Sequence, residues 1–223
     1  MPVATQVAAS LRDAIRFGKL EPGLRLSEQE IADWLNLSRQ PVREAFIRLS
    51  GEGLLEAWPQ RGTFVSKIST QEVMDSRFVR EAVEADIVRL AARKSSASLE
   101  DRLEDLMAQQ EAAEGKDPAH FMHLDEALHR TLAEAAGRAN IWIYLQSLKS
   151  QMDRVRYFVA VELPLAALIR QHRDIVRAVI DGDEERAVAA MRLHLNQIVD
   201  DLPQIIDAHP DFFKGSHTGL QSD

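Results

Sequence analysis

The chain of 223 residues contains no cysteine, which excludes disulfide bonds and metal sites built from thiolates. It also lacks any run approaching the roughly 18 consecutive apolar residues of a membrane-spanning helix. The basic, apolar and small-residue succession of a signal peptide is missing as well, so we expect a cytoplasmic protein. What is present is ordinary for a globular chain: 45% hydrophobic and 28% charged residues. Such a chain can bury a real core in one large or two modest domains.

Charge is unevenly distributed along the chain. The formal net charge of −8 at pH 7 argues against nucleic-acid binding by the surface as a whole. Residues 1–66 carry eight Lys/Arg and eight Asp/Glu, whereas the remainder carries nineteen against twenty-seven. The first third is therefore neutral, as a DNA-binding head on an acidic body would require.

The first third of the sequence predicts three helices followed by a hairpin. Apolar residues at helical spacing indicate a helix over 6–17, and Ser27 with Glu30 forms the capping box of a short second helix. A tight turn at Asn36, a residue type that tolerates the left-handed backbone, leads into a third helix over 38–50. Two β-rich runs around the turn sequence PQRG then predict a hairpin. This order of elements is that of a winged helix-turn-helix.

The third predicted helix begins with a positive, polar tip. Arg39, Gln40 and Arg43 lie away from its apolar stripe, at the end where free backbone N–H groups already favour anions. Arginine can pair with guanine and glutamine with adenine in a major groove. A solvated basic face is the alternative, but five elements in the right order favour DNA. The candidate DNA-binding residues are Ser38, Arg39, Gln40, Arg43 and, at the hairpin tip, Arg61 and Gly62.

No strand signal follows residue 71, and turn and cap residues divide the rest into helical segments. We expect a six-helix bundle with helices over 72–94, 98–115, 118–136, 139–159, 162–182 and 183–208. The predicted fold class is therefore mainly α. Its expected divisions are a winged helix-turn-helix domain over 1–66, a linker over 67–71, a helical domain over 72–209 and a poorly ordered tail over 210–223.

Four polar side chains fall within the apolar stripes of the predicted bundle. Asp125 and His129, four residues apart, project from the same side of one helix, and His172 and His194 lie in the stripes of two others. Burying ionisable groups without partners is costly, and one divalent cation would satisfy all four. Three separately satisfied core histidines are the alternative, but their joint placement favours metal. Zinc is the expected ion, and nickel, manganese and iron also suit such a ligand set.

Arg80 is a related oddity, because it falls in the apolar stripe of the first predicted bundle helix. A guanidinium that faces a core needs an anion. Glu84, one turn on, is the structural candidate, and a bound carboxylate effector between Arg80 and the metal is the functional one. Arg154 and Arg156 could contribute to the same site.

Two parts of the sequence resemble a known family. The segment PGLRLSEQEIADWLNLSRQPVREAFIRLSGEGLLEAWPQRGTFV is similar to the DNA-binding domain of GntR transcription regulators, with Asn36 where glycine is usual. The segments REAVEADIVRLAA, LDEALHRTLAEAAG, QHRDIVRAVIDGDEERA and MRLHL resemble the FCD ligand-binding domain of the FadR subgroup. Six helices in the body would suggest the shorter, VanR-like branch.

The resemblance implies roles for particular residues. Operator contacts would come from Gln29, Ser38, Arg39, Gln40, Arg43, Arg61 and Gly62, and metal ligands from Asp125, His129, His172 and His194. It also implies a homodimer that binds a palindromic operator and a small organic acid next to the metal. We therefore expect a DNA-binding regulator, a repressor rather than an enzyme. The alternatives are a metalloenzyme and a metal site that only stabilises the fold.

Overall fold

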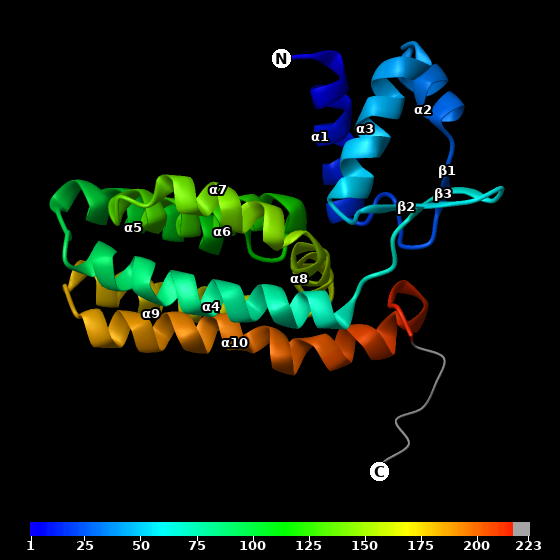
Figure 1. Ribbon diagram of the computed structural model, residues 1–223. Helices are drawn as coiled ribbons and strands as arrows, with labels where there is room; N and C mark the ends of the chain where they lie inside the picture. Colours follow the sequence, from blue (N-terminus) through cyan, green and yellow to red (C-terminus); the bar gives the residue numbers. More distant parts are fainter. Residues whose placement is uncertain (216–223) are drawn as a thin grey trace.

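The computed structural model describes residues 1–215, which form a small head above one end of an elongated helical body (Figure 1). The head contains three helices and a three-stranded antiparallel sheet of order β1-β3-β2. Its elements are α1 (Val3–Arg16), β1 (Arg25–Leu26), α2 (Glu28–Leu35), α3 (Arg39–Gly51), β2 (Leu55–Trp58) and β3 (Gly62–Val65). The predicted winged helix-turn-helix is confirmed. Strand β1 was not predicted, because a two-residue strand is too short to show alternation.

The head is held together by one apolar cluster. Val7, Leu11 and Ile15 recur at helical spacing on α1 and pack with Val42 and Phe46 of α3. This packing directs the opposite side of α3 toward solvent. The exposed side carries the polar residues of the helix tip.

The turn between α2 and α3 forms as its sequence predicts. Asn36 adopts φ 53° and ψ 46°, the left-handed conformation expected there. The Ser27 hydroxyl accepts a hydrogen bond from the backbone N–H of Glu30, which caps α2. Ser38 occupies the N-cap position of α3 without a side-chain cap bond. Its hydroxyl is therefore exposed and not committed to capping.

The body contains seven α-helices between Thr70 and Ala208, not the six predicted. They are α4 (Thr70–Ala92), α5 (Ala97–Ala113), α6 (Pro118–Ala135), α7 (Ala139–Leu148), α8 (Ser150–Glu162), α9 (Ala166–Ile180) and α10 (Glu184–Ala208). The predicted helix over 139–159 is broken at Lys149. With seven helices in the body, the helix count no longer supports assignment to the VanR-like branch.

The break at Lys149 has a physical cause. Its ammonium group is buried and hydrogen-bonds the Asp153 carboxylate at 2.6 Å. The carbonyl of Leu148 accepts a hydrogen bond from the Ser76 hydroxyl at 2.7 Å. The chain therefore turns without leaving this carbonyl unsatisfied. The apolar pattern runs through the break, so sequence periodicity alone joined the two helices.

The helices of the body form two layers, with α4, α9 and α10 in one and α5, α6 and α7 in the other, while α8 crosses the end that faces the head (Figure 1). The main core lies between the layers and includes Leu103, Phe121, Leu128, Trp142 and Val176. Among the described residues, none of the helices is long and apolar enough to cross a membrane.

The first part of the predicted flexible tail is structured. Pro210–Phe212 forms a short 3-10 helix, and Phe213 is buried and pairs with Ile68 of the linker in a parallel bridge. The Ile68 N–H donates to the Phe212 carbonyl, and the Lys214 N–H donates to the Ile68 carbonyl. The prediction is therefore corrected for residues 210–215. The remainder of that segment, 216–223, lies outside the described residues.

Candidate metal centre and DNA-binding face

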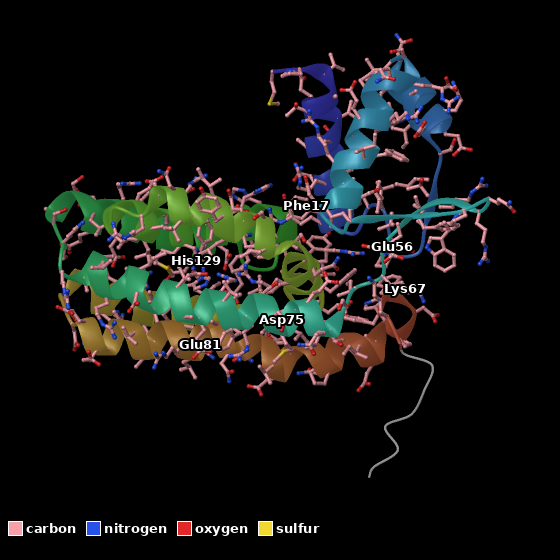
Figure 2. The ribbon with its side chains drawn as sticks, viewed as in Figure 1. Phe17, Glu56, Lys67, Asp75, Glu81 and His129 are labelled. Atoms are coloured by element: carbon pink, nitrogen blue, oxygen red, sulfur yellow. The ribbon has the colours of Figure 1, made fainter. Side chains whose placement is uncertain are left out.

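The four predicted metal ligands meet inside the body. Asp125 and His129 come from α6, His172 from α9 and His194 from α10, and one ligand atom of each lies within 4.8 Å of the others. All four side chains are buried, and His129 lies well inside the helical body (Figure 2). The apolar stripes of three helices, α6, α9 and α10, thus face one another and bring one carboxylate and three imidazoles together.

Two of the imidazoles are held by hydrogen bonds on the side away from this cluster. His129 Nδ1 lies 2.5 Å from Glu84 Oε2, and His172 Nδ1 lies 2.6 Å from Gln110 Oε1. Both partners are acceptors, since Gln110 uses its own amide N–H₂ toward the Leu124 carbonyl. Each Nδ1 therefore carries a proton, and each ring directs its Nε2 toward the cluster.

The inward-facing atoms have few partners other than one another. His172 Nε2 and Asp125 Oδ2 are buried without a hydrogen bond, although His172 Nε2 lies 3.2 Å from Asp125 Oδ1. His129 Nε2 and His194 Nε2 are 3.2 Å apart. Lone pairs that face one another across a buried cluster repel unless a proton or cation lies between them. The donor set therefore fits a divalent cation bound by three nitrogens and one oxygen.

The electrostatics favour the metal-binding protonation states of His172, His194 and Asp125. Burial lowers the pKa of His172, although Asp125 opposes the shift, and burial together with His172 holds the pKa of His194 well below its usual value. Burial alone would raise the pKa of Asp125, but Arg156 and the neighbouring histidines together hold that pKa well below the usual range. Neutral imidazoles and an ionised carboxylate are the ligand forms of these groups.

Arg80 forms an ion pair within the core. Its Nε lies 2.5 Å from Glu84 Oε1, and both side chains are buried. Burial would raise the pKa of Glu84, but the charges of Arg80 and His129 lower it to about 2. The structural partner named from the sequence is therefore present. Glu84 in addition holds a candidate metal ligand.

A small cavity of about 30 Å³ lies beside His194. Arg80 and Arg156 line it, together with Gln197 and Asp201. Arg156 also donates to Asp125 Oδ1 at 2.5 Å. The sequence left the direction of Arg156 ambiguous, and it gave no signal for Gln110, because a polar residue in a helix reveals its partner only once the helices are packed.

The candidate DNA-binding residues lie on α2, at the start of α3 and at the turn between β2 and β3. Gln29, Ser38, Arg39, Gln40, Arg43 and Arg61 are exposed, and Gly62 is half-buried at the start of β3. Three of these side chains are held by acids: Arg39 by Glu28 at 3.3 Å, Gln29 by Asp33 at 2.7 Å and Gln40 by Glu44 at 3.0 Å.

The wing contains a position, Gly62, at which the backbone conformation requires glycine. Gly62 has φ +108°, and a Cβ at this position would lie 2.9 Å from Arg25 Nε. The neighbouring Arg61 guanidinium stacks over the Trp58 ring, with 5.1 Å between Cζ and the ring centroid. The wing tip therefore presents the Arg61 cation stacked on an aromatic ring, next to a glycine backbone that the Arg25 side chain approaches closely.

A winged helix-turn-helix joined to a helical body with a buried His/Asp cluster defines a DNA-binding transcription regulator. Residues 3–65 match the family of bacterial regulatory proteins called gntR, and residues 75–197 match the FCD domain. The chain belongs to the GntR family and carries an FCD domain. Members of this family are transcriptional regulators rather than enzymes.

Related regulators are similar in sequence along almost the whole chain. The HTH-type transcriptional repressor RspR of Escherichia coli is 38% identical over 95% of this chain and 94% of its own. The "Probable D-xylose utilization operon transcriptional repressor" of Paenarthrobacter nicotinovorans is 32% identical over 86% of each. Among solved structures, E. coli McbR/YncC has a TM-score of 0.79 at 20% identity, covering 92% of this chain and 99% of that one. This structural likeness supports the fold.

Proposed function

We propose that the protein is a homodimeric repressor whose binding to a palindromic operator is controlled by a divalent metal and a small organic acid bound in the helical body. The observation that carries the proposal is the cluster of four buried candidate ligands, two of which have an atom without a hydrogen bond, beside a cavity lined by two arginines. A regulator of this class needs a sensing site separate from its DNA-binding head, and the buried cluster supplies one.

Operator recognition is assigned to the exposed tip of α3, its neighbour on α2 and the wing. Arg39, Gln40 and Arg43 would enter the major groove, with Ser38 and Gln29 at its edge, while Arg61 and Gly62 would approach the adjacent minor groove or phosphates. The carboxylates that hold Arg39 and Gln40 in the free protein must be exchanged for base or phosphate contacts. Only bases that form hydrogen bonds as good as those with Glu28 and Glu44 compensate for this loss, and this requirement supports specificity.

Dimerisation is supported by an apolar surface on α7. Its buried face carries Trp142 and Leu145, yet Ile143, Tyr144 and Leu148 are more than half exposed on the same helix. An apolar face of this kind is typical of a protein–protein contact. Two heads related by a twofold axis would read half-sites about one helical turn, or about 34 Å, apart.

The proposed effector is a small carboxylate. Arg156 and Arg80 supply positive charge at the cavity wall, and His194 brings the metal site to the same wall. A cavity of about 30 Å³ requires either a very small acid or an opening of the surrounding helices. Zinc is the ion proposed for the site, because three imidazoles and one carboxylate suit its tetrahedral geometry.

A metal site that only stabilises the fold is the second candidate. It is favoured by the burial of the four ligands, of which His194 is the most exposed at 5%. Removing the metal would then lower the melting temperature and leave operator binding by the folded protein unchanged. Operator titrations on zinc-loaded and chelator-treated protein, well below the melting temperature, separate the two candidates.

The direct test is footprinting on DNA upstream of the protein's own gene. The double substitution Arg39→Ala/Arg43→Ala should weaken operator binding by roughly 30-fold or more, because each arginine contact with a base is worth about 1–3 kcal/mol. Arg102→Ala/Arg130→Ala, which removes two exposed arginines from the body, is the control with equal charge. Equal loss in both variants, or no protected site at moderate salt, would contradict the assignment.

A further inference from the structure

A chain of buried ion pairs connects the candidate metal centre to the DNA-binding head. It starts at Asp125, whose Oδ1 accepts a hydrogen bond from Arg156 Nη2 at 2.5 Å. Arg156 lies on α8, and its Nη1 is 3.8 Å from Oδ1 of Asp153, nearly one turn earlier on the same helix. Arg156 thus touches a candidate metal ligand, borders the cavity and contacts the next acid in the chain.

The head enters this chain through Arg16, the last residue of α1. Its Nε lies 3.5 Å from Asp153 Oδ2, and its Nη2 lies 2.8 Å from Glu126 Oε2. Glu126 follows Asp125 directly on α6. Arg16 is therefore connected to Asp125 in two ways, through the Asp153–Arg156 pair and through the backbone of α6.

Burial makes these partners dependent on one another. Side-chain exposure is 10% for Arg156, 6% for Asp153 and 14% for Arg16. Removing one partner of a buried pair leaves an uncompensated charge, which costs far more than breaking a pair at the surface. If one of these side chains moves, the ion pairs formed by the others therefore change as well.

Helix α8 also holds the backbone at the junction between head and body. Arg154 donates to the carbonyl of Ser66 at 2.8 Å, and Gln151 donates to the carbonyl of Gly53 at 3.0 Å. Ser66 follows β3 and directly precedes the linker, and Gly53 lies between α3 and β2. Helix α8 thus contacts the candidate ligand site, the end of α1, the residue before the linker and the segment that follows α3.

We propose that the Arg156–Asp153–Arg16 chain, with Glu126 as its second arm, transmits the state of the ligand site to the head. Arg156 is the branching residue, because an anion in the cavity competes with Asp125 and Asp153 for its guanidinium. When Arg156 binds Asp153 less tightly, the contact between Asp153 and Arg16 changes, and α1, which ends at Arg16, changes its position. The inference rests on the proposed function of the site, and it names the route by which that site controls the head.

The test compares Arg16→Gln with Arg12→Gln. Arg12 lies one turn earlier on α1 and pairs with Glu52 of the head itself, so its loss leaves the contact between head and body intact. Because the chain has no cysteine, Ser50→Cys on the head and Asp101→Cys on the body accept spin labels selectively, and both positions are exposed. Labelled chains are diluted with unlabelled protein, and the distance distribution is measured with and without zinc.

The expected result is a narrow distribution that shifts with zinc in the parent protein and in Arg12→Gln. Arg16→Gln should give a broad distribution that no longer responds, although it still binds zinc in a calorimetric titration. A narrow distribution in Arg16→Gln that shifts with zinc as in the parent overturns the proposal. If zinc does not bind the parent yet Arg16→Gln alone broadens, the metal-dependent function fails while the mechanical link stands.

Discussion

At the residue scale, the candidate metal centre depends on side chains that would not touch the ion. Glu84 and Gln110 fix the ring protons of His129 and His172, and so determine which nitrogen faces the cluster. The sequence predicted that the four candidate ligands would face one core, because the i, i+4 spacing of Asp125 and His129 and the apolar stripes around His172 and His194 locate them. It paired Glu84 with Arg80 and missed its bond to His129, because that contact depends on how α4 packs against α6.

Replacing Glu84 with glutamine should weaken zinc binding about 10- to 100-fold, the usual effect of losing such an outer partner. The neutral amide is a weaker acceptor for His129 Nδ1–H and leaves Arg80 without its buried counter-ion. A competition titration with a zinc chelator measures the change. Glu81→Gln, on the same helix but in contact with Arg77 near the surface, is the control and should bind zinc as the parent does. Equal affinities for all three proteins would contradict the role assigned to Glu84.

At the element scale, the break between α7 and α8 gives the body its functional geometry. A continuous helix over 139–159 would have run along the bundle. The turn at Lys149 instead sends α8 across the end that faces the head (Figure 1). Sequence periodicity predicted the other body helices to within a few residues but could not show this break, because the causes are a buried ammonium group and a hydroxyl from another helix.

Ser76→Ala should destabilise the protein by about 1 kcal/mol, the net contribution of a hydrogen bond to a partly buried carbonyl. The affected carbonyl is that of Leu148, at the break itself. Urea unfolding measures the loss. Ser98→Ala, at an exposed position of helix α5, controls for the better helix propensity of alanine and should be neutral or slightly stabilising. If the two variants unfold at the same urea concentration, the hydroxyl does not support the break.

At the scale of the whole molecule, the contact between head and body is electrostatic as well as apolar. Phe17 packs into the body core at the junction of head and body (Figure 2). Arg16, directly before it, pairs with Glu126 and Asp153. The sequence predicted both parts and their order. It did not predict how they meet, because ion pairs between distant segments leave no periodic signal in either segment.

The pH dependence of stability should reveal the ion pair between Arg16 and Glu126. Burial alone would raise the pKa of Glu126, but Lys149 and Arg16 outweigh it and lower that pKa from 4.5 to about 2. The unfolded chain therefore takes up a proton at a higher pH than the native one. The stabilisation by Glu126 is complete above about pH 5 and is lost as the pH falls toward 2.

Glu126→Gln should therefore melt below the parent protein at pH 7, and the gap should narrow as the pH is lowered to 3. After allowance for screening by solvent, the difference at pH 7 is on the order of 1 kcal/mol. Calorimetric melting curves at several pH values measure it. Glu114→Gln, at an exposed position, should follow the parent at every pH. A gap that stays constant from pH 7 to 3 would show that the Glu126 charge does not stabilise the native state.

The pairing of Phe213 with Ile68 bears on the order in which the molecule is completed. The linker is synthesised well before Phe213, with which Ile68 pairs. The head can therefore fold before its linker is fixed, because the pairing forms only after residues 212–214 have been made. A chain that stops before these residues would have a folded DNA-binding head on a linker that lacks this pairing.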